Sequence, residues 1–216
     1  MTIRAAAWVG MVLGLSAVLT LPAMADLPEA FPITTDNLIV VGMAPTEVAE
    51  FDPLLVDYPA PVAVVMAKAV TTTGTNLLDE VLQTKHSVGI YQYHAGLRRW
   101  MPMWEQVTGE LSIAFVEGYE ILDVTGNGSP ELAVRIRYSG PERVLDYVVK
   151  SVENGQVNDV FQRRSVYQGR VTASTGFIVF DAPVSDEPDF RKEEIYAWDP
   201  DQERFDKIRE IRNRVR

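Results

Sequence analysis

The stretch RVLDYVVKSVENGQVNDVFQRR, residues 143–164, predicts a β-hairpin. Valine and aromatic residues, which pack well on a pleated surface, recur on both sides of Asn154-Gly155. Asparagine and glycine both tolerate a positive φ, as the two central residues of a type I′ turn must. We therefore expect two antiparallel strands, 143–152 and 156–164, joined by this turn.

Similar strand signals recur along the chain at spacings of about ten residues. Turn residues such as Gly, Pro and Asn separate them, for example at 126–130 and 139–141. Many short strands joined in this way predict an all-β fold of antiparallel meanders, arranged as a sandwich, an open barrel or partial propeller-like sheets. The further predicted strands are 87–94, 99–106, 118–124, 131–138, 165–171, 177–181, 193–198 and 204–211.

The chain before residue 61 has a different composition, with prolines recurring among acidic residues. Because proline disrupts regular elements, we predict an irregular, extended segment over 26–60, with a short strand at 38–41 and one or two helical turns within 46–55. The apolar run 61–70 predicts a strand buried on both faces, with a short core helix as the alternative. The β-rich domain then covers 61–211, and a basic tail covers 212–216.

The first 25 residues have the three parts of a secretory signal peptide. Arg4 precedes an uncharged apolar stretch, which ends at the small residues of Ala23-Met24-Ala25. We expect cleavage before Asp26, with a retained membrane anchor as the alternative. The mature protein is then exported, whether secreted, periplasmic or associated with the cell wall, and has no transmembrane span after cleavage.

Charge and residue usage exclude several function classes. The chain has 20 basic and 30 acidic residues, a net charge of −10, which disfavours nucleic acid as a partner. It has no cysteine, so disulfides, thiolate nucleophiles and lipid-modified cysteines are excluded. No Gly-x-Ser-x-Gly, His-Glu-x-x-His or glycine-rich phosphate motif is present, which disfavours a triad hydrolase, a zinc protease and a nucleotide enzyme.

The segment 121–132, ILDVTGNGSPEL, contains the one motif with recognisable chemistry. Oxygen-bearing side chains alternate at Asp123, Thr125 and Asn127, and Gly128 allows a sharp turn before Ser129 and Glu131. A hard cation such as calcium takes oxygen ligands at this spacing. The alternative is a metal-free turn, in which Asp and Asn accept backbone N–H groups.

This loop resembles the cation loop of FG-GAP and VCBS repeats, which joins two strands in propeller-type and secreted bacterial proteins. The resemblance covers about a dozen residues. It implies a calcium site formed by Asp123, Thr125, Asn127, the Ser129 carbonyl and Glu131. Thr125 and Asn127 stand where the family usually has aspartate, so the implied site is weak and structural.

These features together predict a non-catalytic exported β-module, binding or structural in the cell envelope, whose partner is an envelope polysaccharide or a protein. Trp100 and Trp104 are predicted to share one face of a strand, as an exposed binding platform or as part of the core. The alternative function is a secreted hydrolase of the glycosidase type, which uses a pair of carboxylates and needs no local motif.

Overall fold

The computed structural model describes residues 31–55, 60–73, 81–109, 114–185 and 187–215. Every regular element in these ranges is a β-strand, so the predicted all-β fold is confirmed. Within the same ranges, no helix has the length and apolar character needed to cross a membrane. The signal peptide predicted at 1–25 lies outside the described residues.

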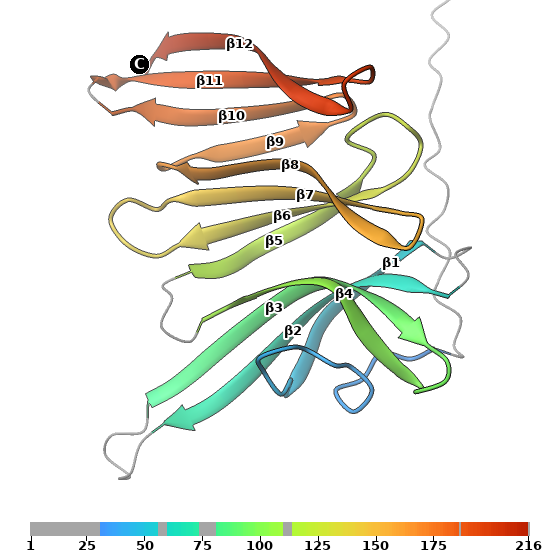
Figure 1. Ribbon diagram of the computed structural model, residues 1–216. Coiled ribbons are helices and arrows are strands. Elements are labelled where there is room, and N and C mark those ends of the chain that lie inside the picture. Colours follow the sequence, from blue (N-terminus) through green and yellow to red (C-terminus); the bar gives the residue numbers. More distant parts are fainter. Residues whose placement is uncertain (1–30, 56–59, 74–80, 110–113, 186, 216) are drawn as a thin grey trace, which may run out of the picture.

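The strands form three four-stranded antiparallel sheets, each made of four consecutive strands (Figure 1). Sheet A contains β1 (Glu47–Leu55), β2 (Val62–Thr73), β3 (Val81–His94) and β4 (Arg99–Thr108). Sheet B contains β5 (Ala114–Leu122), β6 (Glu131–Tyr138), β7 (Leu145–Glu153) and β8 (Gln156–Val166). Sheet C contains β9 (Arg170–Ser174), β10 (Phe177–Val184), β11 (Glu187–Asp199) and β12 (Arg204–Arg214).

The sheets stack in chain order, with sheet B in the middle (Figure 1). One apolar cluster joins sheets A and B, where Val64 and Ile90 pack with Leu132 and Val134. A second cluster joins sheets B and C and includes Leu145, Val149, Ile178 and Phe180. Apolar residues on both faces of β7 explain its nearly continuous burial, since burying apolar area is the main driving force for such stacking.

The predicted hairpin between β7 and β8 is confirmed. Asn154 and Gly155 have φ angles of 51° and 77°, both positive as a type I′ turn requires. The β11–β12 hairpin brings Trp198 opposite Phe205, with 5.1 Å between their ring centroids. Residues 62–65 of β2 are fully buried, as predicted for a strand covered on both faces.

The segment before residue 61 is more regular than its prolines suggested. Residues 47–55 form strand β1, so the predicted helical turns are wrong. β1 lies at the edge of sheet A and its register shifts after Pro53, which is how a strand accommodates a proline. The predicted strand at 38–41 is reduced to a single parallel bridge from Leu38 to Trp100.

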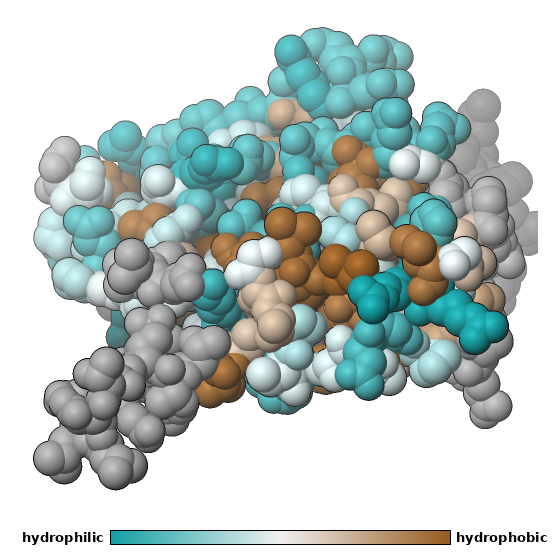
Figure 2. All heavy atoms as spheres, turned by 60° about the horizontal axis from the view of Figure 1, so that its bottom comes forward, coloured by the Kyte–Doolittle hydropathy of each residue, from teal (hydrophilic) through white to brown (hydrophobic). Residues whose placement is uncertain are grey.

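Residues 31–48 cover the outer face of sheet A. Ile33, Leu38 and Val40 pack there with Tyr91 and Trp100. Figure 2, which turns the bottom of Figure 1 forward, shows apolar side chains gathered in the middle of this face with polar groups around them. The N-terminal segment therefore covers Tyr91 and Trp100, while some apolar surface stays exposed in the middle of this face.

A β-bulge in β4 corrects the prediction that Trp100 and Trp104 share a face. Ile90 pairs with Trp104 and Tyr91 pairs with Pro102, so Met103 is the extra residue. Trp100 is fully buried under the N-terminal segment, whereas Trp104 packs on the opposite face toward sheet B. The two rings cannot form one flat platform.

Two boundaries in the last third of the chain also differ from the prediction. The predicted strand 165–171 is divided, because β8 ends at Val166 and β9 begins at Arg170. Gln168 lies between them with a left-handed backbone, φ 42°. Residues 212–214 of the predicted basic tail belong to β12, the edge strand of sheet C.

Candidate anion-binding site

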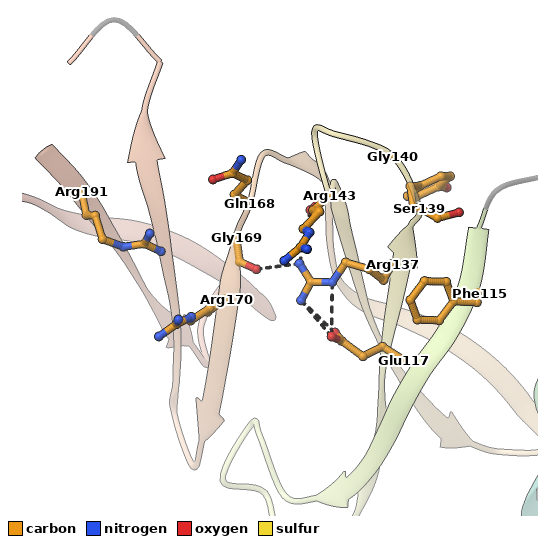
Figure 3. A pocket seen from close by; sticks show the side chains of 11 residues that line it. Phe115, Glu117, Arg137, Ser139, Gly140, Arg143, Gln168, Gly169, Arg170 and Arg191 are labelled. Atoms are coloured by element: carbon orange, nitrogen blue, oxygen red, sulfur yellow. Dashed lines mark hydrogen bonds and ion pairs between the residues drawn. The ribbon is translucent and has the colours of Figure 1, made fainter. Parts of the chain in front are cut away.

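A pocket of about 730 Å³ lies where sheets B and C meet (Figure 3). Its walls come from β5, β6, the β6–β7 turn, the β8–β9 turn, the start of β9, and β11. Four arginines line it, and Glu117 is the only acidic residue among the described residues of the lining. They are Arg137, Arg143, Arg170 and Arg191.

Arg137 fixes the wall of the pocket. Its guanidinium donates to both carboxylate oxygens of Glu117, at 2.9 and 3.0 Å, and to the carbonyl of Gly169 at 2.9 Å. A further bond reaches the carbonyl of Arg143 at 3.3 Å. One side chain thus links β5, β6 and the two turns, and the bidentate pair holds it in one orientation.

Arg191 is held on the sheet C side in a similar way. Its Nε donates to Asp181 on the neighbouring strand β10, at 2.7 and 3.0 Å to the two oxygens. The hydrogen bond to Asp181 raises the pKa of Arg191 from its ordinary value, which keeps the guanidinium charged. Arg137 and Arg191 therefore have a carboxylate partner each.

Arg143 and Arg170 have no such partner. Both side chains are exposed, and within the described residues neither guanidinium makes an ion pair or a side-chain hydrogen bond. Two uncompensated positive charges therefore face a cavity in a protein whose net charge is −10. Guanidinium groups form planar pairs of hydrogen bonds with carboxylate and phosphate, so an anion is the chemistry that this pocket suits.

Two residues of the pocket have strained backbones. Arg143 has φ 44° and Gln168 has φ 42°, in the left-handed region that glycine or asparagine adopts at lower cost. Each lies in a turn that lines the pocket, and each keeps a long polar side chain there. Strain of this kind is concentrated at functional sites, because the surrounding structure must hold the residue in place.

An aromatic ring completes the lining. Phe115, near the start of β5, is 40% exposed. Figure 3 shows its ring beside Arg137 and the Ser139-Gly140 turn. The pocket thus offers an apolar surface next to its positive charges.

A second pocket of about 380 Å³ lies between β8 and sheet C. Among the described residues, its lining has three carboxylates and three basic side chains, so the charges of the lining balance. Glu194 is nearly buried there and accepts hydrogen bonds from Arg163, Lys192 and Tyr196. Burial raises the pKa of Glu194, but Lys192, Arg163 and Lys207 together lower it below its usual value. This carboxyl group stays ionised and paired.

The predicted cation loop connects β5 to β6, and its side chains bind backbone groups. Asp123 accepts N–H bonds from Gly126 (2.7 Å), Asn127 (3.1 Å) and Gly128 (3.0 Å). The Asn127 side chain accepts the N–H of Ser129 at 2.7 Å. These are the contacts of an Asx turn, the metal-free alternative considered for this loop.

Glu131 lies at the base of the loop and is fully buried. It accepts the N–H of Val124 at 2.6 Å and the hydroxyl of Thr125 at 2.8 Å. Burial raises the pKa of Glu131 despite these bonds. The structure thus brings Thr125 and Glu131 together, while Asp123, Asn127 and Ser129 form the outer turn. No group of three acidic or histidine side chains with metal-binding geometry occurs among the described residues.

The arginine pocket was not predicted from the sequence. Its four arginines are spread from position 137 to position 191, and only the stacking of sheets B and C brings them together. The local signal was limited to the turn residues around Gly140 and Gly169.

Comparisons with known proteins add no relative. No protein-family model matches the chain, and a search of curated proteins finds no match.

Proposed function

We propose that this protein is a non-catalytic, exported β-module of the cell envelope that binds an anionic ligand in the arginine pocket between sheets B and C. The observation that carries the proposal is the pair of unpaired guanidiniums, Arg143 and Arg170, at a cavity of about 730 Å³. Export rests on the signal-like first 25 residues. Calcium remains a further proposal for the Asp123 loop, as a structural ion.

A binding role is favoured over the alternative hydrolase. A glycosidase of the usual kind needs two carboxyl groups across one cleft, one of them kept protonated by a raised pKa. In the described part of the chain, the arginine pocket has one carboxylate, Glu117, which is engaged by Arg137. In the second pocket, Glu194 and Glu210 both have lowered pKa values because lysines and an arginine surround them, so neither suits a general acid.

The test measures polyanion binding by isothermal titration calorimetry at low salt. The ligands are polygalacturonate, polyphosphate and polyglutamate, with neutral dextran as the uncharged comparison. We expect saturable binding of a polyanion to the wild type. The double variant Arg143→Gln/Arg170→Gln is expected to bind about tenfold or more weakly, since hydrogen bonds to charged groups contribute about 1.5–3 kcal/mol each.

The matched control is Arg98→Gln/Arg209→Gln. Arg98 is also an exposed arginine in a hairpin turn, with φ 52°, and Arg209 is an exposed strand residue of sheet C. The control removes the same charge outside the pocket and is expected to bind as the wild type does. If both double variants lose the same affinity, the binding is diffuse electrostatic attraction and the proposal is wrong.

A further inference from the structure

The two unpaired guanidiniums approach the pocket from different sheets. Arg143 belongs to the turn between β6 and β7 of sheet B, and Arg170 is the first residue of β9 in sheet C. Figure 3 shows Arg143 beside Arg137 on one side of Gly169, and Arg170 on the other side, toward Arg191. The unpaired positive charge of the pocket is therefore divided between a sheet B side, with Arg143, and a sheet C side, with Arg170.

The volume of the pocket suits a ligand larger than a single anion. A volume of about 730 Å³ lies within the range of pockets that enclose organic ligands of several rings. A lone carboxylate or phosphate on one guanidinium would leave most of this volume to water. A ligand that reaches both sides needs two anionic groups and a spacer between them.

Two further lining residues match the chemistry of sugar rings: Gln168, near both charges, and Phe115, on the far side of Arg137 from Arg170 (Figure 3). Phe115 presents a partly exposed aromatic ring, on which the C–H face of a pyranose can pack. The Gln168 side chain donates to the Tyr167 hydroxyl at 3.1 Å, which leaves its amide oxygen as an acceptor for a ligand hydroxyl. The strained backbone of Gln168 holds this amide at the rim of the pocket.

We infer that the ligand is an acidic oligosaccharide with charged groups on two of its sugar residues, one bound by Arg143 and the other by Arg170. This inference rests on the proposed function and narrows it from any anion to one class. Arg137 and Arg191, held by Glu117 and Asp181, then act as fixed supports that keep the two charged sides in place.

The experiment titrates the full mature protein with galacturonate, digalacturonate and trigalacturonate under the conditions of the polyanion test. We expect digalacturonate to bind about tenfold or more tightly than the monosaccharide, because only the longer ligand engages both guanidiniums. Arg143→Gln and Arg170→Gln should each reduce digalacturonate affinity toward that of the monosaccharide. The single control variants Arg98→Gln and Arg209→Gln should leave it unchanged.

Equal affinity for one and two sugar units would overturn the inference. So would binding of polyphosphate or polyglutamate at the pocket with no binding of the uronates; in that case the proposed anion binding would stand, with another ligand class. Loss of all polyanion binding would refute both proposals. The three results are therefore distinguishable from one another.

Discussion

Arg143 combines an unfavourable backbone conformation with a side chain that faces the pocket. Its φ of 44° lies in the left-handed region, where an ordinary residue costs about 1–2 kcal/mol more than in a relaxed conformation. Glycine would remove this strain but would also remove the guanidinium. Stability and binding should therefore respond in opposite directions to one substitution at this residue.

We predict that Arg143→Gly leaves the free energy of unfolding unchanged or raises it by about 0.5–1 kcal/mol, because relief of strain exceeds the entropy that glycine adds to the unfolded chain. The same variant should bind the polyanion about tenfold more weakly than the wild type. Thermal melts and calorimetric titrations measure the two effects on one sample.

Arg98→Gly is the control for this substitution, since Arg98 has a comparable φ of 52° in the β3–β4 turn. It should show the same change in stability with unaltered affinity. Equal affinities for Arg143→Gly and Arg98→Gly would show that the guanidinium of Arg143 does not contact the ligand.

Among the elements, the β5–β6 loop has two alternative roles: a calcium site or a metal-free, hydrogen-bonded turn. Its Asp123 carboxylate accepts three backbone N–H groups, and the loop carbonyl of Val124 accepts the N–H of Gly176 from the β9–β10 turn at 2.7 Å. The loop therefore also ties sheet B to sheet C.

We predict that Asp123→Ala lowers the free energy of unfolding by about 1–3 kcal/mol in excess chelator, because it leaves backbone donors of the loop without their acceptor. Asp123→Asn keeps one side-chain oxygen as an acceptor, so its free energy of unfolding should fall by less than that of Asp123→Ala. Chemical denaturation with urea measures both. A wild-type-like Asp123→Ala variant would show that these bonds do not hold the loop.

Millimolar calcium added to the same samples distinguishes a calcium site from a metal-free turn. A cation that binds only the folded protein must raise the melting temperature of the wild type and not that of Asp123→Ala. If calcium changes neither melting temperature, the loop is a hydrogen-bonded turn and the resemblance to FG-GAP repeats is limited to turn chemistry.

Elements fixed by local chemistry were predictable from the sequence, and those that depend on distant partners were not. The Asn154-Gly155 hairpin and the apolar run of β2 carry their signals within a few residues. β1 was missed because its proline suits only an edge strand, and the sequence does not say which strand is at an edge. The bulge at Met103 likewise depends on the register of β4 against β3.

The arginine pocket was missed for the same reason at a larger scale. Its residues come from four separate stretches of the two upper sheets, and none of them is unusual by itself. Arg143 and Gln168 are distinguished only by backbone angles that a sequence does not display. A candidate site of this kind becomes visible only when the order and packing of the sheets are known.

At the scale of the whole molecule, three sheets stack without disulfides, so non-covalent contacts hold sheet C on sheet B, and the apolar cluster between them is the main one. Besides the apolar cluster, an ion pair crosses this boundary. Arg163 on β8 donates to Glu194 on β11 at 3.1 Å, and the Glu194 side chain is only 7% exposed. Lys192 and Lys207 surround the same carboxylate.

This cluster predicts how stability depends on pH. Although burial raises the pKa of Glu194, the bond from Lys192 and the charges of Arg163 and Lys207 lower it below its unfolded value of about 4.5. The unfolded protein thus binds the proton first, and the stabilisation is present above pH 4.5 and is lost as the pH falls through the lower, folded pKa.

We predict that Glu194→Gln lowers the free energy of unfolding by about 1–3 kcal/mol at pH 7, because it leaves cations around a neutral amide. Below pH 4.5 the wild type should lose stability more steeply than the variant, so that the two curves converge. Glu187→Gln is the matched control, since its pair with Arg212 is exposed and should contribute only about 0–1 kcal/mol at any pH. Parallel curves for the wild type and Glu194→Gln from pH 7 to pH 3, measured by urea denaturation, would show that this carboxylate does not join the two sheets electrostatically.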